Sequence, residues 1–229
     1  IIEGNEFTDD NIVISLIDDI PNVDIKTQSN LILKKLIRSD LFKSVKVTYD
    51  SDNFFIKIIE YPSINNFFYT SNERIKDEDI DNIINELELY TLSESKINNL
   101  IDELYKIYQS FGYNNIQIDY RSEDYSNNSS DVYLDFNEGR ITKIRKINFV
   151  GNSLFDKNIL LSKIKSKTKS ITNIFANNNF KIFELNNDLI RIQNFYKQLG
   201  YRDVNVEYEV EYYSNNKVEI FFLINEGQQ

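Results

Sequence analysis

The chain has 229 residues, a formal net charge of −10 at pH 7, and neither Cys nor His. The missing Cys excludes disulfides, thiol nucleophiles and zinc–thiolate sites, and the missing His removes the most common general base. The acidic balance argues against nucleic acid as a partner. Composition therefore favours a binding or scaffold role over catalysis, and we expect no cofactor and no enzymatic activity.

The ends and the hydropathy of the chain give a second set of expectations. No apolar run reaches about 18 residues, so the sequence predicts no helix that spans a bilayer. It has no signal-peptide pattern and begins at Ile1-Ile2 in a strand-like segment. We therefore expect a piece of a longer protein, with its first strand truncated.

The first segment, residues 1–62, shows the order strand, two helices and two further strands. Gly4-Asn5 is a turn dipeptide that follows the short first strand. Thr8 and Thr27 each precede a stretch with apolar residues at helical spacing, which predicts the two helices. The last strand leads into Pro62.

The second segment, residues 63–139, repeats this order. Ser71-Asn72 stands in the place of the Gly-Asn step, and Asp77 is the expected N-cap of the first helix. Gly112 ends the second helix, because glycine readily adopts the left-handed conformation found there. The last strand closes at Asn137-Glu138-Gly139.

The third segment, residues 140–229, is the clearest copy. Residues 143–150 predict a strand before Gly151-Asn152, and Asp156 is the expected N-cap of a short helix. A polar loop and a longer helix follow, and Gly200 ends that helix.

Two strands complete the third segment. Residues 204–210 alternate apolar and polar side chains, which is typical of a half-buried strand, and residues 218–224 form a more apolar strand. The second and third segments place Gly-Tyr and Asn-Glu-Gly at the same spacing of 88 residues. Each segment therefore offers one apolar sheet face and two helices with one apolar stripe, which predicts small two-layer α+β domains.

The joints between the segments are very short. Pro62 is followed directly by the next strand, and few residues separate Gly139 from Ile144. Short joints limit relative motion without abolishing it. We therefore predict three domains, 1–62, 63–139 and 140–229, in an elongated arrangement with hinges at Pro62 and Gly139.

The ordered motifs resemble POTRA domains of the Omp85 family, which assembles outer-membrane β-barrels. The resemblance covers nearly the whole chain and is carried by residues 58–64, 137–139 and 147–155, with Ile174-Phe175 in the long loop also fitting it. It implies three POTRA-like domains, each with a three-stranded mixed sheet packed on two helices. It also implies the strand order first–third–second. Further POTRA units and barrel strands of that family are not part of this sequence.

The resemblance implies a periplasmic domain of a Gram-negative outer-membrane protein. Its role would be that of a scaffold or chaperone-like arm in a β-barrel assembly machine. Its partners would be unfolded outer-membrane proteins, accessory lipoproteins of the assembly complex and the C-terminal β-barrel of the parent chain, with no nucleic acid. The alternative is a dedicated secretion or import transporter of the Omp85 superfamily, in which the same domains recognise one client family.

The implied strand order leaves the alternating strand at a sheet edge, where a partner strand can be added. In the third segment the predicted partner-binding residues are Asn205, Val206, Glu207, Tyr208, Glu209 and Val210. Asn205, Glu207 and Glu209 are expected on the outer face. Either this strand accepts client strands, or its glutamates are charges that block unwanted pairing; both interpretations stay open.

Two further features of the third segment allow more than one interpretation. Lys163, Lys165, Lys167 and Lys169 form a basic run that either meets anionic lipid head groups or an acidic partner, or belongs to a solvated loop. Phe221 and Leu223 lie on the strand face opposite Ile220, Phe222 and Ile224. They either pack at a joint between domains or line a groove for a peptide.

Overall fold

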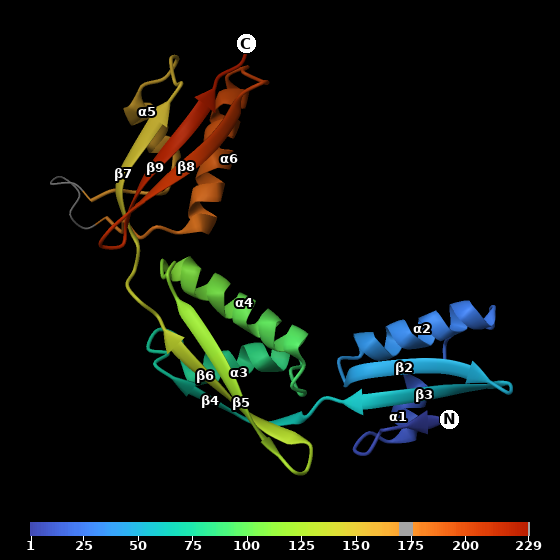
Figure 1. Cartoon of the computed structure of the whole chain (residues 1–229). Helices are drawn as coiled ribbons and strands as arrows, with labels where there is room; N and C mark the ends of the chain where they lie inside the picture. Colours follow the sequence, from blue (N-terminus) through green and yellow to red (C-terminus); the bar gives the residue numbers. More distant parts are fainter. Residues whose placement is uncertain (170–175, 229) are drawn as a thin grey trace. The chain divides into compact units, whose positions relative to one another are not determined.

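The computed structural model describes residues 1–169 and 176–228 (Figure 1). Ile174 and Phe175 lie outside the described residues. The chain divides into two compact units, Ile1–Glu103 with Ile118–Phe136 and Leu104–Gln117 with Asn137–Gln229. The predicted boundaries of three domains, and their elongated arrangement, stay predictions.

The first sheet contains β1 (Ile2–Glu3), β3 (Asn53–Glu60) and β2 (Phe42–Asp50), in that spatial order. β1 is parallel to β3 and β2 is antiparallel to it, so the sheet is mixed. The two helices of this part are α1 (Asp10–Ser15) and α2 (Ile25–Arg38). Their buried residues, among them Val13 and Leu36, join Ile56 and Ile58 of β3 in one core.

Both helices of the first segment begin after an aspartate and not after the predicted threonines. The Asp9 carboxylate accepts a hydrogen bond from Asn11 N, and the Asp24 carboxylate accepts one from Thr27 N at 3.0 Å. Thr27 therefore lies inside α2 as the donor to its N-cap. Aspartate is the stronger N-cap because its charged oxygen both bonds the free N–H groups and favours the positive helix end.

The second sheet has the order β4 (Ser63–Thr70), β6 (Ser129–Asn137), β5 (Gln117–Tyr125), with β4 parallel to β6. Its helices are α3 (Asp77–Glu86) and α4 (Glu94–Phe111), and α4 extends from the first unit into the second. Lys76, not the predicted Asp77, is the N-cap of α3. The Asp77 carboxylate instead accepts a hydrogen bond from Asn72 Nδ2 at 2.7 Å, which ties the preceding turn to the helix.

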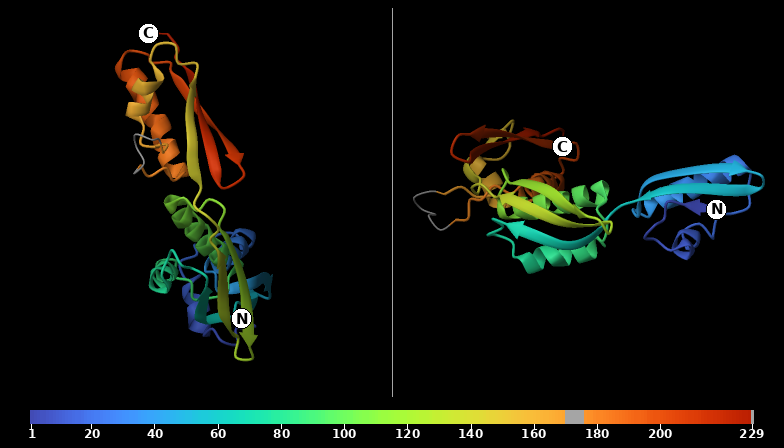
Figure 2. Two further views of the ribbon diagram at one scale, coloured as in Figure 1. Left: turned by 90° about the vertical axis from the view of Figure 1, so that its left-hand side faces the viewer. Right: turned by 60° about the horizontal axis from the view of Figure 1, so that its bottom comes forward.

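The third sheet has the order β7 (Lys143–Val150), β9 (Lys217–Asn225), β8 (Asn205–Tyr213). β7 is parallel to β9, and β8 is antiparallel to it. Helices α5 (Lys157–Lys163) and α6 (Ile182–Gln198) lie on one face of this sheet (Figure 2). Three mixed three-stranded sheets with accompanying helices confirm the predicted α+β fold class and the implied strand order.

The Gly-Asn step has the same structural cause in the first and third copies. Gly4 and Gly151 have φ of +90° and +85°, and a Cβ on either would lie 2.1 Å from the carbonyl oxygen of Ile58 or Ile224. Glycine is therefore required where the first strand leaves its parallel neighbour. The asparagine that follows donates from Nδ2 to the carbonyl three residues ahead, as Asn152 does to Phe155 at 2.9 Å.

Candidate functional site

Strand β8 forms one edge of the third sheet. It pairs with β9 without interruption, from Asn205 opposite Asn225 to Tyr213 opposite Lys217. Within the described residues no strand pairs with its other side. All six predicted partner-binding residues, 205–210, thus lie on one regular edge strand.

The side chains of β8 divide cleanly between its two faces. Val206 is 2% exposed, and Tyr208 donates from its hydroxyl to Asn186 Oδ1 on α6 at 3.0 Å, so these residues face the helices. Glu207 and Glu209 are exposed on the opposite face. The alternation predicted from the sequence is therefore the alternation in the structure.

The outer backbone groups of β8 carry one side-chain contact that sequence reasoning missed. Gln193 Nε2 on α6 donates to the Val206 carbonyl at 3.4 Å, a long and weak hydrogen bond. The N–H and C=O of one residue point the same way in an antiparallel strand. We therefore assign the N–H and C=O groups on the outer side of β8 to Val206, Tyr208 and Val210. Gln193 contacts one of these groups, the Val206 carbonyl.

The sheet face away from the helices holds a shallow hollow beside β8. It has a volume of about 240 Å³ and its lining includes Val150, Gly151, Glu207 and Leu223. Phe221 and Leu223 are half-buried, while Val150 is 51% exposed. Part of the lining is thus apolar, and the choice between a joint and a peptide groove for Phe221 and Leu223 stays a prediction.

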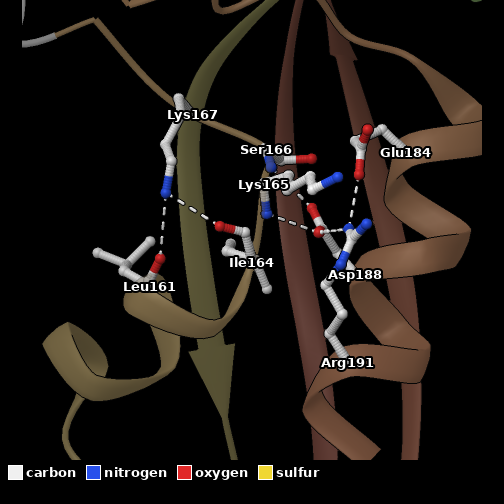
Figure 3. A network of polar contacts seen from close by, with 8 residues as sticks. All are labelled: Leu161, Ile164, Lys165, Ser166, Lys167, Glu184, Asp188 and Arg191. Atoms are coloured by element: carbon white, nitrogen blue, oxygen red, sulfur yellow. Dashed lines mark hydrogen bonds and ion pairs between the residues drawn. The ribbon is translucent and has the colours of Figure 1, made fainter.

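A buried carboxylate fixes the loop that leads away from α5 (Figure 3). Asp188 of α6 is 0% exposed and accepts hydrogen bonds from Lys165 N at 2.7 Å and Ser166 N at 2.8 Å. Arg191 Nη1 donates to the same carboxylate at 2.6 Å and to Glu184 at 2.5 Å. This network holds the loop against α6 and so supports the helix that lies beside β8.

The basic run is partly engaged by its own unit. Lys167 Nζ donates to the Ile164 carbonyl at 3.0 Å, and Lys163 Nζ lies 4.6 Å from the centre of the Phe195 ring. All four lysines of the run are exposed. Two of the four lysines thus contact other residues of their own unit. This favours the interpretation of the basic run as part of a solvated loop over its interpretation as a binding surface.

The glutamate of the Asn-Glu-Gly motif ties the end of the last strand to the rest of its copy. Glu226 accepts hydrogen bonds from Leu154 N at 2.9 Å, from the Tyr196 hydroxyl at 2.9 Å, and from Ser153 Oγ. Glu60 accepts from Thr8 N at 2.6 Å in the corresponding place of the first copy. Sequence reasoning used the glycine of this motif and missed its acid, although a glutamate recurs there in every copy.

The pKa of Glu226 predicts a pH dependence of stability. Burial pushes this pKa up, but the hydrogen bonds from Ser153, Leu154 and Tyr196 outweigh it, so the pKa lies below its ordinary value of 4.5. The unfolded chain then binds more protons than the folded one as pH falls below 4.5. We therefore expect the free energy of unfolding to decrease as the pH falls from 4.5 through the pKa of Glu226 in the folded chain. Urea titrations at a series of pH values measure this decrease.

Two variants control this prediction. Glu226→Gln should remove its share of the pH slope, and Tyr196→Phe should reduce that share by deleting one of the hydrogen bonds to the carboxylate. An unchanged slope between pH 4.5 and 2.5 in Glu226→Gln would show that the carboxylate does not contribute.

The structure shows the local backbone of the two predicted hinge residues. The Pro62 carbonyl accepts a hydrogen bond from Leu92 N at 2.8 Å. Gly139 has a φ of +65° and follows β6. The hinge role of both residues stays a prediction.

Across the described ranges, no group of three or more acidic residues is placed to hold a metal ion.

Comparison with known proteins places these features in a family. The POTRA family model, described as surface antigen variable number repeat, matches residues 142–227. Two curated relatives are both named outer membrane protein assembly factor BamA. The protein of Neorickettsia risticii is 26% identical over 99% of this chain, and that of Buchnera aphidicola is 28% identical over 86%. The chain is similar to the POTRA-containing BamA proteins along nearly its whole length, and residues 142–227 match the POTRA family itself.

The array spans about a third of the length of these two relatives, 31% and 33% respectively. The crystal structure of POTRA3-5 of BamA from Haemophilus influenzae is 14% identical, with 97% of this chain and 93% of that chain covered and a TM-score of 0.44. The N-terminal domain of Omp85 from Thermosynechococcus elongatus is 16% identical, with 100% and 96% covered and a TM-score of 0.44.

POTRA arrays of this type are the periplasmic domain of an outer-membrane protein, and this location applies to the chain. Separately, no helix within the described residues is both long and apolar enough to cross a membrane.

Proposed function

We propose that this POTRA array is the binding arm of an outer-membrane β-barrel assembly factor. It holds unfolded outer-membrane proteins by transient strand addition at β8 and docks accessory lipoproteins of the assembly complex. The names of the curated relatives support the assembly role. The observation that carries the binding mode is the regular nine-residue strand β8 (Asn205–Tyr213), which is paired on one side only among the described strands.

Strand addition suits a receptor with many clients. Its affinity comes from backbone hydrogen bonds, which every extended chain can form, and side chains only modulate it. One edge strand buries little area, so binding is weak and reversible. Such binding lets an unfolded client be held and then released.

Photo-crosslinking in the intact parent protein tests this function. Photoreactive residues are placed at Asn205, Glu207 and Glu209, and matched ones at Lys46 and Thr48 on the edge of the first sheet. Crosslinks to many different outer-membrane proteins from the β8 positions support the proposal. Crosslinks confined to one client family would favour the dedicated transporter, and no protein crosslink from β8 would rule out strand addition there.

A backbone variant separates strand addition from side-chain contact. Val206→Pro removes the N–H assigned to the outer side of β8, whereas Val206→Ala loses similar side-chain packing but keeps that N–H. We expect the proline variant to bind the peptide at least about tenfold more weakly than the alanine variant. The reason is that proline removes one backbone hydrogen bond to the peptide and its ring clashes with the added strand. Fluorescence anisotropy measures the affinities.

Circular dichroism is the control for this pair. Val206→Pro should melt within a few degrees of Val206→Ala, because the outward N–H makes no bond to β9. A proline variant that unfolds would show that this N–H belongs to the ladder with β9. Equal affinities of two folded variants would show that partners do not use the edge.

A further inference from the structure

We propose that β8 selects extended segments that carry Lys or Arg at every second position. This inference rests on the proposed strand addition at β8 and adds the class of client. It is carried by three carboxylates, Glu207, Glu209 and Glu211, which stand in a row on the face of β8 away from the helices.

The row is regular and consists of three acidic side chains. Alternate residues of a strand lie about 6.8 Å apart on one face, so the three side chains follow the repeat of any strand added beside them. Glu207 accepts a hydrogen bond from the neutral Asn205 amide at 3.0 Å, and Glu211 accepts one from the Tyr213 hydroxyl at 2.6 Å. No cation of the described residues forms an ion pair with any of the three.

The nearby charges on the same sheet face do not neutralise this row. Glu219 of β9 is paired with Arg145 at 3.6 Å, and Arg145 also lies 4.9 Å from the centre of the Tyr213 ring. Arg145 therefore already forms an ion pair with Glu219. The row on β8 remains open to cations from a partner.

The other two edge strands of the same kind lack such a row. The matching exposed positions of β2 are Ser44, Lys46, Thr48 and Asp50. Those of β5 are Gln117, Asp119, Arg121 and Glu123. Both strands carry charges of both signs at these positions, and Arg121 also stacks on the Tyr133 ring at 3.7 Å. Of β2, β5 and β8, only β8 carries acids and no cation at these exposed positions.

An added strand would place side chains directly opposite this row. Opposite charges in such cross-strand pairs stabilise the pairing, and like charges destabilise it. The same rule opposes pairing of β8 with β8 of a second copy, which would bring glutamate against glutamate. Blocking of unwanted pairing and selection of clients are thus two results of one charge pattern.

The helix side of β8 sets the other half of the pattern. Val206 and Val210 alternate with the glutamates and lie on the face that packs toward α6, beside Tyr208. An added strand would extend this apolar face. The segment that fits is therefore amphipathic, with apolar residues alternating with Lys or Arg.

The test compares three labelled nine-residue peptides with Val at alternate positions. The residues between are Lys, Gln or Glu, and the chain of residues 1–229 is titrated with each at low salt. The variant E207Q/E209Q/E211Q removes the row. The variant E78Q/D79N/E86Q removes three exposed acids of α3 as a matched control. A photoreactive residue at Asn205 reports whether the peptide lies at β8.

We expect the Lys peptide to bind about tenfold more tightly than the Glu peptide, from three cross-strand pairs of modest strength. This preference should fall below about twofold in the β8 variant. It should fall equally in 0.5 M salt, because charges that lie more than a few ångströms apart are then screened from one another. It should persist in the α3 control.

Other outcomes overturn the inference or the function it rests on. Equal affinities of the Lys and Glu peptides, with crosslinks at Asn205, leave strand addition intact and contradict charge selection. A Lys preference that survives in the β8 variant places the selectivity elsewhere and also contradicts it. No crosslink from any of the three peptides contradicts strand addition itself.

Discussion

Replacing Asp188 with alanine is expected to destabilise the unit that contains α6 by about 3–5 kcal/mol. The carboxylate is 0% exposed and bonds Lys165 N, Ser166 N and Arg191. Its loss leaves the Arg191 cation without one of its acids and two backbone donors without an acceptor, and each such orphaned group costs free energy. Urea denaturation, followed by circular dichroism, measures the loss.

Asp156→Ala is the matched control for this variant. Asp156 precedes α5, is exposed, and makes no side-chain capping hydrogen bond. Its removal should cost less than about 1 kcal/mol, which is the size of its interaction with the helix dipole. Equal losses in the two variants would show that the network around Asp188 does not hold the loop.

Gly151→Ala is expected to cost about 2–5 kcal/mol. A left-handed conformation costs a residue with a Cβ about 1–2 kcal/mol. The new methyl group would also lie 2.1 Å from the Ile224 carbonyl oxygen, which forces the backbone to move at a further cost of about 1–3 kcal/mol. Gly4→Ala should behave alike, because its Cβ would lie equally close to the Ile58 carbonyl oxygen. Thermal or urea unfolding measures both losses.

Gly139→Ala distinguishes the two parts of this cost. Gly139 also has a positive φ, of +65°, but its Cβ would have its nearest neighbour, the Asn115 carbonyl oxygen, at 3.6 Å. Only the conformational cost of about 1–2 kcal/mol is then expected. If Gly151→Ala is no worse than Gly139→Ala, close approach to Ile224 is not the reason for the glycine.

The repeated turns and strands were accessible from the sequence because they depend on local rules. The alternation of Val206, Tyr208 and Val210 is set by which side of one strand each residue faces. The Gly-Asn steps at Gly4 and Gly151 mark positions where only glycine fits between two strands. These signals act over a few residues and recur from copy to copy, so the fold class followed from them, whereas the strand order was implied by the resemblance to POTRA domains.

The polar networks were not accessible in the same way. Asp188 lies on a helix among other polar residues, where a charge usually indicates a solvent-facing position. Its partners, Lys165 N and Ser166 N, are backbone groups of a distant loop, and nothing in their side chains marks them. The Gln193 contact with the β8 edge depends equally on tertiary packing. By contrast, the role of Glu226 could have been inferred from its recurrence at Glu60 and Glu138.

The state of the β8 edge decides whether this array binds clients in the proposed way. Amide hydrogen exchange along residues 205–213, with and without a saturating client-derived peptide, tests this most directly. The proposed binding predicts fast exchange in the free chain at the alternate amides of Val206, Tyr208 and Val210, and protection of these same amides when peptide is bound. Slow exchange at all three in the free chain, or no change at saturation, would contradict it.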